Sequence, residues 1–84
     1  MHNAKLDSSP RLQRVLTVLE DATGELSTRD ICFAANVHAL SSIISELRAP
    51  PNNRIITCRQ VVDNGERRWL YRLVRPLEQM EMAL

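Results

Sequence analysis

The sequence predicts a single α+β domain in which three helices are followed by a two-stranded β-hairpin. Apolar residues recur at helical spacing in three segments of the first half of the chain. A proline pair then ends the helical part. A run rich in β-branched residues follows and leads into an Asn-Gly dipeptide, the strongest short-range signal for a hairpin. The chain of 84 residues is long enough for one domain with a small core.

The first helix is expected over residues 10–22. Ser9 is a favourable N-cap, and Pro10 suits the first helical position, where its missing N–H has no intrahelical partner. Gly24 is a candidate for the residue that ends the helix in a left-handed conformation. The apolar stripe of this helix is Leu12, Val15, Leu16 and Leu19.

Two shorter helices are expected next, the second ending near residue 35 and the third spanning 38–48. Ser27 and Asp30 have the spacing of a capping box at the start of the second helix. Asn36 stands where the turn between the helices needs a left-handed residue, which Asn tolerates better than most residues. Two short helices joined by a tight turn form a helix-turn-helix.

The hairpin is expected after the Pro50-Pro51 stop, with strands over 54–62 and 67–74 and a turn at 63–66. Trp69 falls on the same face of the second strand as Tyr71 and Leu73, because strand side chains alternate. We therefore expect Trp69 to pack in the core or at the base of the hairpin. Three helices followed directly by a hairpin is the order of a winged helix-turn-helix.

Charge is distributed unevenly along the chain, although the net charge is only +1. Residues 43–75 hold seven arginines and three acidic residues, a net charge of +4. Arginine forms bidentate contacts with phosphates and base edges. The domain is expected over residues 9–75, between a flexible N-terminus (1–8) and a C-terminal tail (76–84).

Composition and motifs argue against several classes of function. No apolar run approaches the roughly 20 residues of a membrane span, and the first nine residues are too polar for a signal peptide. Cys32 and Cys58 are expected to be free thiols in a reducing cytoplasm. The two histidines lie far apart, no paired-carboxylate motif or glycine-rich loop is present, and no zinc-ligand spacing occurs. We therefore expect neither an enzyme nor a bound cofactor or metal.

Four segments carry a resemblance to a known family: Ser27–Ile31, Ala35–Arg48, Arg54–Arg59 and Arg68–Leu73. Together they resemble small phage and prophage winged helix-turn-helix domains, over about residues 10–75. The resemblance implies DNA binding. This chain departs from the family pattern at Asn36, where Gly is usual, at Ile43, where Arg is common, and in its linker at 50–53.

The candidate DNA-binding surface combines the polar face of the third helix with the arginines of the hairpin. Its residues are His38, Ala39, Ser41, Ser42, Ser45, Arg48, Arg54, Arg59, Asn64, Arg67 and Arg68. Serine can donate to or accept from bases and phosphates, and a thymine methyl can pack against alanine. Two plainer interpretations stay open: the serines form a solvated helix face, and the arginines protect an exposed strand edge.

These expectations favour a sequence-specific DNA-binding protein, a small phage-type transcriptional regulator. The helix over 38–48 would enter the major groove of double-stranded DNA, while the arginine-rich hairpin, or wing, contacts the backbone. A homodimer is expected on general grounds, because one small module buries limited surface on DNA. A candidate dimer seam is formed by Leu77, Met80, Met82 and Leu84.

Two alternatives remain from the sequence. One is a winged-helix module that binds a protein partner and not DNA, which the low charge of the third helix favours. The other is a folded fragment of a larger phage protein without an activity of its own.

Overall fold

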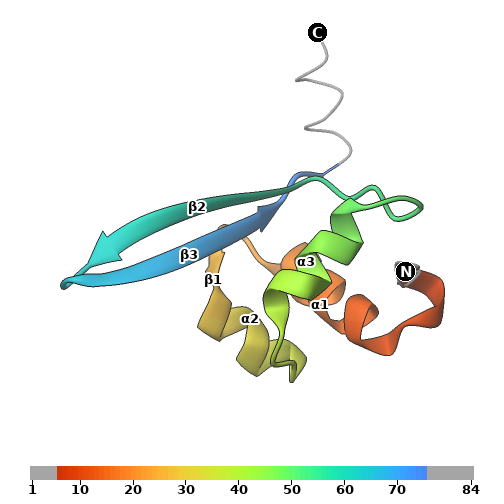
Figure 1. The fold of residues 1–84 in the computed structure, drawn as a ribbon, viewed down its shortest axis with the longest axis horizontal. Helices are drawn as coiled ribbons and strands as arrows, with labels where there is room; N and C mark the ends of the chain where they lie inside the picture. Colours follow the sequence, from red (N-terminus) through yellow and green to blue (C-terminus); the bar gives the residue numbers. More distant parts are fainter. Residues whose placement is uncertain (1–5, 76–84) are drawn as a thin grey trace, which may run out of the picture.

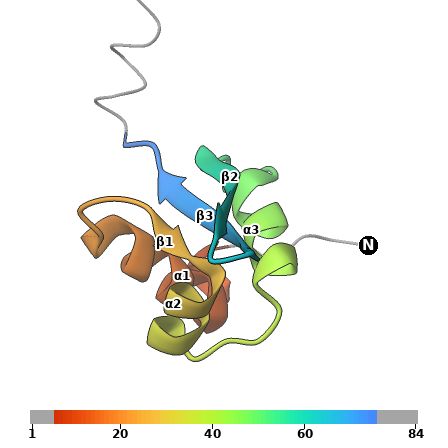
Figure 2. The same ribbon diagram turned by 90° about the vertical axis from the view of Figure 1, so that its left-hand side faces the viewer.

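The computed structural model describes residues 6–75 and has the α+β architecture that the sequence predicts (Figure 1). The three helices lie on one side of an antiparallel sheet (Figures 1 and 2). In chain order the elements are η1 (Leu6–Ser8, a 3-10 turn), α1 (Pro10–Asp21), β1 (Leu26–Ser27), α2 (Thr28–Ala35), α3 (Leu40–Arg48), β2 (Ile56–Asp63) and β3 (Glu66–Leu73).

The sheet has three strands in the order β1-β3-β2, so the expectation of a two-stranded hairpin alone is wrong. The additional strand is β1, in which Leu26 pairs with Tyr71 and Ser27 pairs with Leu70. A strand of two residues has no periodicity that a sequence can display. Leu26 and Ser27 form a strand only because the backbone of β3 lies beside them and pairs with them.

The limits of α1 and α2 agree closely with the expected ones. Pro10 occupies the first turn of α1, and Ser9 is its N-cap residue, although the Ser9 side chain makes no capping bond. Ser27 and Asp30 form the expected capping box on α2, with the Ser27 hydroxyl accepting from the Asp30 N–H at 3.1 Å. The expectation for Gly24 is wrong, because α1 ends at Asp21 with an extended C-cap residue, Ala22, and Gly24 is not left-handed.

The turn between α2 and α3 is longer than expected. Asn36 is left-handed, with φ of 54°, as predicted. However, α3 begins at Leu40 and not at residue 38, because Ala39 has a non-helical backbone and serves as the N-cap. His38 and Ala39 therefore lie in the loop before α3.

One hydrophobic core joins the three helices to the inner half of the sheet. Its buried members are Leu12, Val15, Leu16, Leu19, Ile31, Ala35, Val37, Leu40, Ile43, Ile44, Leu47, Ile56, Tyr71 and Leu73. The apolar stripe of each helix points into this cluster, and the opposite face of each helix lies in solvent.

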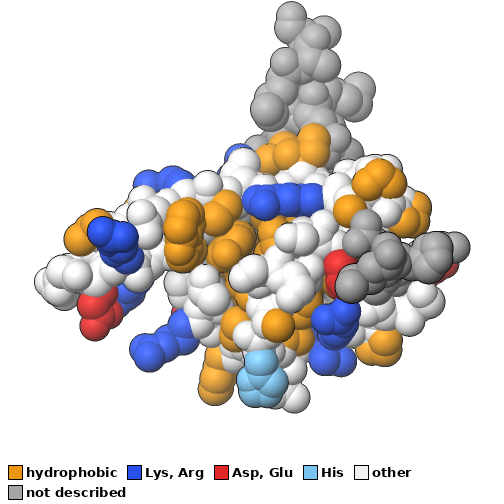
Figure 3. Space-filling model, viewed as in Figure 1, with side chains coloured by type: hydrophobic (Ala, Val, Ile, Leu, Met, Phe, Trp, Pro, Cys, Tyr) orange, Lys and Arg blue, Asp and Glu red, His pale blue; other side chains and the backbone are white. Residues whose placement is uncertain are grey.

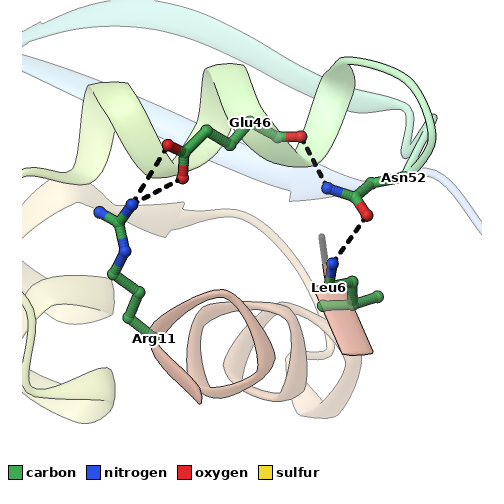
Figure 4. A network of polar contacts seen from close by, with 4 residues as sticks. All are labelled: Leu6, Arg11, Glu46 and Asn52. Carbon is green, nitrogen blue, oxygen red and sulfur yellow. Dashed lines mark hydrogen bonds and ion pairs between the residues drawn. The ribbon is translucent and has the colours of Figure 1, made fainter. Parts of the chain in front are cut away.

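A polar network holds the loop after α3 against the N-terminal part of the molecule (Figure 4). The buried Asn52 accepts from the N–H of Leu6 and donates to the carbonyl of Glu46, both at 2.9 Å. The Glu46 carboxylate in turn accepts from Arg11 on α1 at 3.0 and 3.1 Å. Part of the segment that we expected to be a flexible N-terminus, Leu6–Ser8, is thereby connected to α3.

The hairpin of β2 and β3 extends beyond the helices, to the left in Figure 1. Asn64 and Gly65 form its turn with φ of 51° and 79°, the paired positive values of a type I′ turn. Tyr71 and Leu73 are buried, but Trp69 on the same face is 47% exposed. Of the two expected positions for Trp69, the core and the base of the hairpin, the core is wrong, because the helices do not reach this part of the hairpin.

Candidate nucleic-acid interface

The exposed face of α3 carries three serines. Ser41, Ser42 and Ser45 are exposed because the apolar side of this short helix faces the core; its buried residues are Leu40, Ile43, Ile44 and Leu47. The first N–H groups of an α-helix have no intrahelical acceptor, and at the N-terminus of α3 no N-cap side chain accepts from them. His38 and Ala39 are exposed in the loop just before it. This end of α3 presents hydroxyl groups and backbone donors to solvent.

Ile43 is 1% exposed and belongs to the core. Ile43 is one of the positions at which the sequence departs from the pattern that it resembles, in which Arg is common. In this fold the side chain at position 43 points away from the exposed face of α3. The departure therefore changes the core and not the candidate DNA-binding surface.

Two of the candidate arginines bind the backbone of the protein itself. The Arg48 guanidinium donates twice to the carbonyl of Ile56, from Nε at 3.1 Å and from Nη2 at 2.6 Å. Arg54 donates to the carbonyl of Asn52 at 3.1 Å. Arg48 thus ties the end of α3 to the start of β2, and its guanidinium is directed to the sheet.

Arg59 forms a bidentate ion pair with Glu25, the residue just before β1. Its Nε and Nη2 donate to the two carboxylate oxygens at 2.7 and 2.6 Å. The hydrogen bond from Arg59 is the main reason why the pKa of Glu25 lies below its usual value, and the pKa of Arg59 is raised in return. The pair spans β3 and offsets the Arg59 charge within the fold.

The candidate arginines with the fewest contacts to the rest of the protein lie at the tip of the hairpin. Arg68 lies 3.7 Å from Asp63, an exposed and long ion pair. Arg67 is exposed and makes no hydrogen bond or ion pair within residues 6–75. In the register of the hairpin, Val62 pairs with Arg67 and Val61 with Arg68, so the two arginines point to opposite faces. Asn64, in the turn, is exposed beside them.

Sequence reasoning missed two exposed aromatic residues. Trp69 shares its face of β3 with Arg67, two residues away, and Phe33 on α2 is 89% exposed. Alternation along the strand predicted the face of Trp69, but only the position of the helices decides whether that face is covered. In the space-filling view, hydrophobic and basic side chains alternate along the hairpin (Figure 3).

Comparisons with protein-family models, with curated proteins and with solved structures found no match to this chain. None of the helices within residues 6–75 is long and apolar enough to cross a membrane. Over the same residues, no group of three or more His, Cys, Asp or Glu side chains is arranged to hold a metal ion. Cys32 and Cys58 are both free. The tail that we considered as a dimer seam, residues 76–84, lies outside the described residues.

Proposed function

We propose that this protein is a winged helix-turn-helix domain that binds double-stranded DNA as a phage-type transcriptional regulator. In this proposal the N-terminal half of α3 enters the major groove and the β2–β3 hairpin is the wing that contacts the backbone. The hairpin follows α3 directly, and the pairing of β1 with β3 anchors its base to the helices. These two features support the assignment of the fold.

The observation that carries the proposal is the exposed basic tip of the hairpin. Arg67 and Arg68 project on both faces of a ribbon that extends past the helices, with Asn64 between the strands. Phosphate oxygens are the main hydrogen-bond acceptors in protein–DNA interfaces, and arginine contacts them in bidentate geometry. The uncapped first turn of α3 offers further donors for phosphates, while Ser41 and Ser42 are small enough to let the helix approach base edges.

A protein partner in place of DNA is the second candidate function. Phe33 is 89% exposed on α2, and aromatic residues such as Phe are enriched in the buried centres of protein–protein interfaces. The serine face of α3 also lacks a free arginine, because Arg48 is bound to Ile56. The concentration of cations at the hairpin tip favours DNA over this alternative.

Fluorescence anisotropy with a labelled mixed-sequence duplex tests the proposal. We expect binding at low salt that weakens steeply as salt rises, with a log–log slope of about one for each phosphate contacted. Ser45→Glu places a carboxylate on the α3 face and should abolish most of this binding, whereas Thr17→Glu on the exposed face of α1 should have little effect. If the unmodified protein does not bind the duplex even at low salt, the DNA-binding proposal is wrong and a protein partner is the favoured alternative.

Removal of the Glu25 carboxylate should strengthen DNA binding. Glu25→Gln frees the Arg59 guanidinium from its bidentate partner, so one more cation at the base of the wing becomes available to phosphate. We expect a several-fold gain in affinity at low salt and a salt slope steeper by up to about one unit. The control is Glu66→Gln, which removes a carboxylate at the wing tip without releasing an arginine from a bidentate pair. An equal gain in both variants would mean that overall charge, and not Arg59, is responsible.

A further inference from the structure

The free edge of β2 is the feature on which this inference rests. In the strand order β1-β3-β2, one side of β2 pairs with β3, and no strand within residues 6–75 pairs with the other side. Beyond Ile56 the strand is exposed, apart from a half-buried Val61. An unpaired edge of this length is a template for another strand.

The register of the hairpin identifies which backbone groups of β2 point outward. The Ile55 carbonyl accepts from the N–H of Val74 on the β3 side, whereas the Ile56 carbonyl accepts from Arg48 on the other side. In an antiparallel pair the direction alternates with each residue. The N–H and C=O groups of Cys58, Gln60 and Val62 therefore point outward, and nothing within residues 6–75 bonds to them.

We propose that a second copy of this chain occupies this edge, with the two β2 strands antiparallel and the two-fold axis at Val61. In this register Arg59 of each copy lies opposite Asp63 of the other, and Val61 lies opposite itself. An axis at Arg59 would instead place two like charges in direct opposition, which is destabilising. Arg59 donates from Nε and Nη2 to Glu25, so its Nη1 is available to donate to the Asp63 carboxylate of the second copy.

Pairing with a second copy would also stabilise the outer part of the hairpin, which the helices do not cover. A two-stranded ribbon is marginal in water, and this one exposes Val62 at 71% and Trp69 at 47%. The second copy converts the ribbon into four strands. It places Gln60, whose cross-strand neighbour is Trp69, beside Val62 of the other copy. Arg67 and Arg68 lie on β3, away from the new contact, so the inference does not depend on DNA binding.

Disulfide cross-linking in the absence of DNA tests both the dimer and its register. In a Cys32→Ser, Cys58→Ser background, Val61→Cys brings two thiols together across the axis at a non-hydrogen-bonded pair, where Cα atoms lie about 4.5 Å apart. That separation permits a disulfide. We expect oxidation to yield a covalent dimer, whereas Val62→Cys, which lies opposite Gln60 of the second copy, should stay monomeric. Failure of Val61→Cys to cross-link, or equal cross-linking of both variants, would overturn the proposal.

Analytical ultracentrifugation of the chain with its native cysteines measures the monomer–dimer equilibrium independently. Gln60→Pro removes an outward N–H that β3 does not use, so it should weaken dimerisation at least tenfold and leave the monomer folded. Gln60→Ala keeps that N–H and should still form dimers. Asp63→Lys opposes Arg59 of the second copy and should dissociate the dimer, whereas Glu66→Lys, the same change of charge on β3, should not. A chain that sediments as a monomer at every concentration would contradict the inference without affecting the proposal of DNA binding.

Discussion

Replacing both arginines of the wing tip should lower DNA affinity by roughly 10- to 100-fold at low salt, whatever the sequence of the duplex. Arg67 and Arg68 are exposed, and Arg67 makes no hydrogen bond or ion pair within the described chain. Their loss should therefore cost contacts with phosphates and little stability. The salt slope of Arg67→Ala/Arg68→Ala should be shallower by about two units, because each phosphate contributes roughly 0.9. Anisotropy titrations over a range of salt concentrations measure both quantities.

Two matched variants separate the possible causes of that loss. Arg67→Lys/Arg68→Lys keeps the charge and should keep most of the salt slope, since lysine also contacts phosphate as a point charge. Glu25→Ala/Arg59→Ala removes an ion pair near the base of the wing without changing net charge, so it should leave the slope nearly unchanged. If the wing double variant binds DNA as tightly as the unmodified protein, the assignment of the wing as the phosphate contact is wrong.

Truncating the centre of α3 should have the largest effect on stability. Leu47 is fully buried, between the helices and the sheet. Leu47→Ala removes its packing and leaves a cavity, which costs about 2–5 kcal/mol of the free energy of unfolding in well-packed cores. A domain of this size has a total stability of only about 5–10 kcal/mol. We therefore expect a large fall in the urea midpoint, or a largely unfolded protein, by circular dichroism.

Ser45→Ala is the control on the same helix. Its side chain is exposed and belongs to the candidate DNA-binding face, so its effect on stability should stay within about 0.5 kcal/mol. A loss of less than about 1 kcal/mol for Leu47→Ala would contradict the placement of α3 against the core. The opposite ranking of the two variants would mean that α3 presents its serine face, and not its apolar face, to the sheet.

Local signals predicted those elements whose cause is local. The Ser9-Pro10 start of α1, the Ser27 and Asp30 capping box and the left-handed Asn36 are encoded within one or two turns of chain. The Asn64-Gly65 turn likewise follows from two residues that accept positive φ. By contrast, the start of α3 was misplaced by two residues because neither His38 nor Ala39 carries a strong capping signal.

The arrangement of the candidate site depends on tertiary structure much more than the helices and turns do. The sequence placed the arginines in one segment, but it did not distinguish those that brace the fold from those that face solvent. Arg48 and Arg59 are committed to Ile56 and Glu25, and the latter partner lies 34 positions away in the sequence. The Arg59–Glu25 pair depends on how β3 brings β1 and β2 into one sheet, and no local pattern encodes it.

The amino-acid sequence by itself determined the type and order of the main elements, their apolar faces and the concentration of arginine after α3, because helix and strand periods act over a few residues. Only the tertiary structure decided that β1 completes the sheet and that Trp69 remains exposed. Among residues 6–75, it also decided that one edge of β2 stays unpaired and that the Arg67 side chain has no partner. These properties depend on which surfaces the helices cover, and coverage is set by long-range packing of the whole chain.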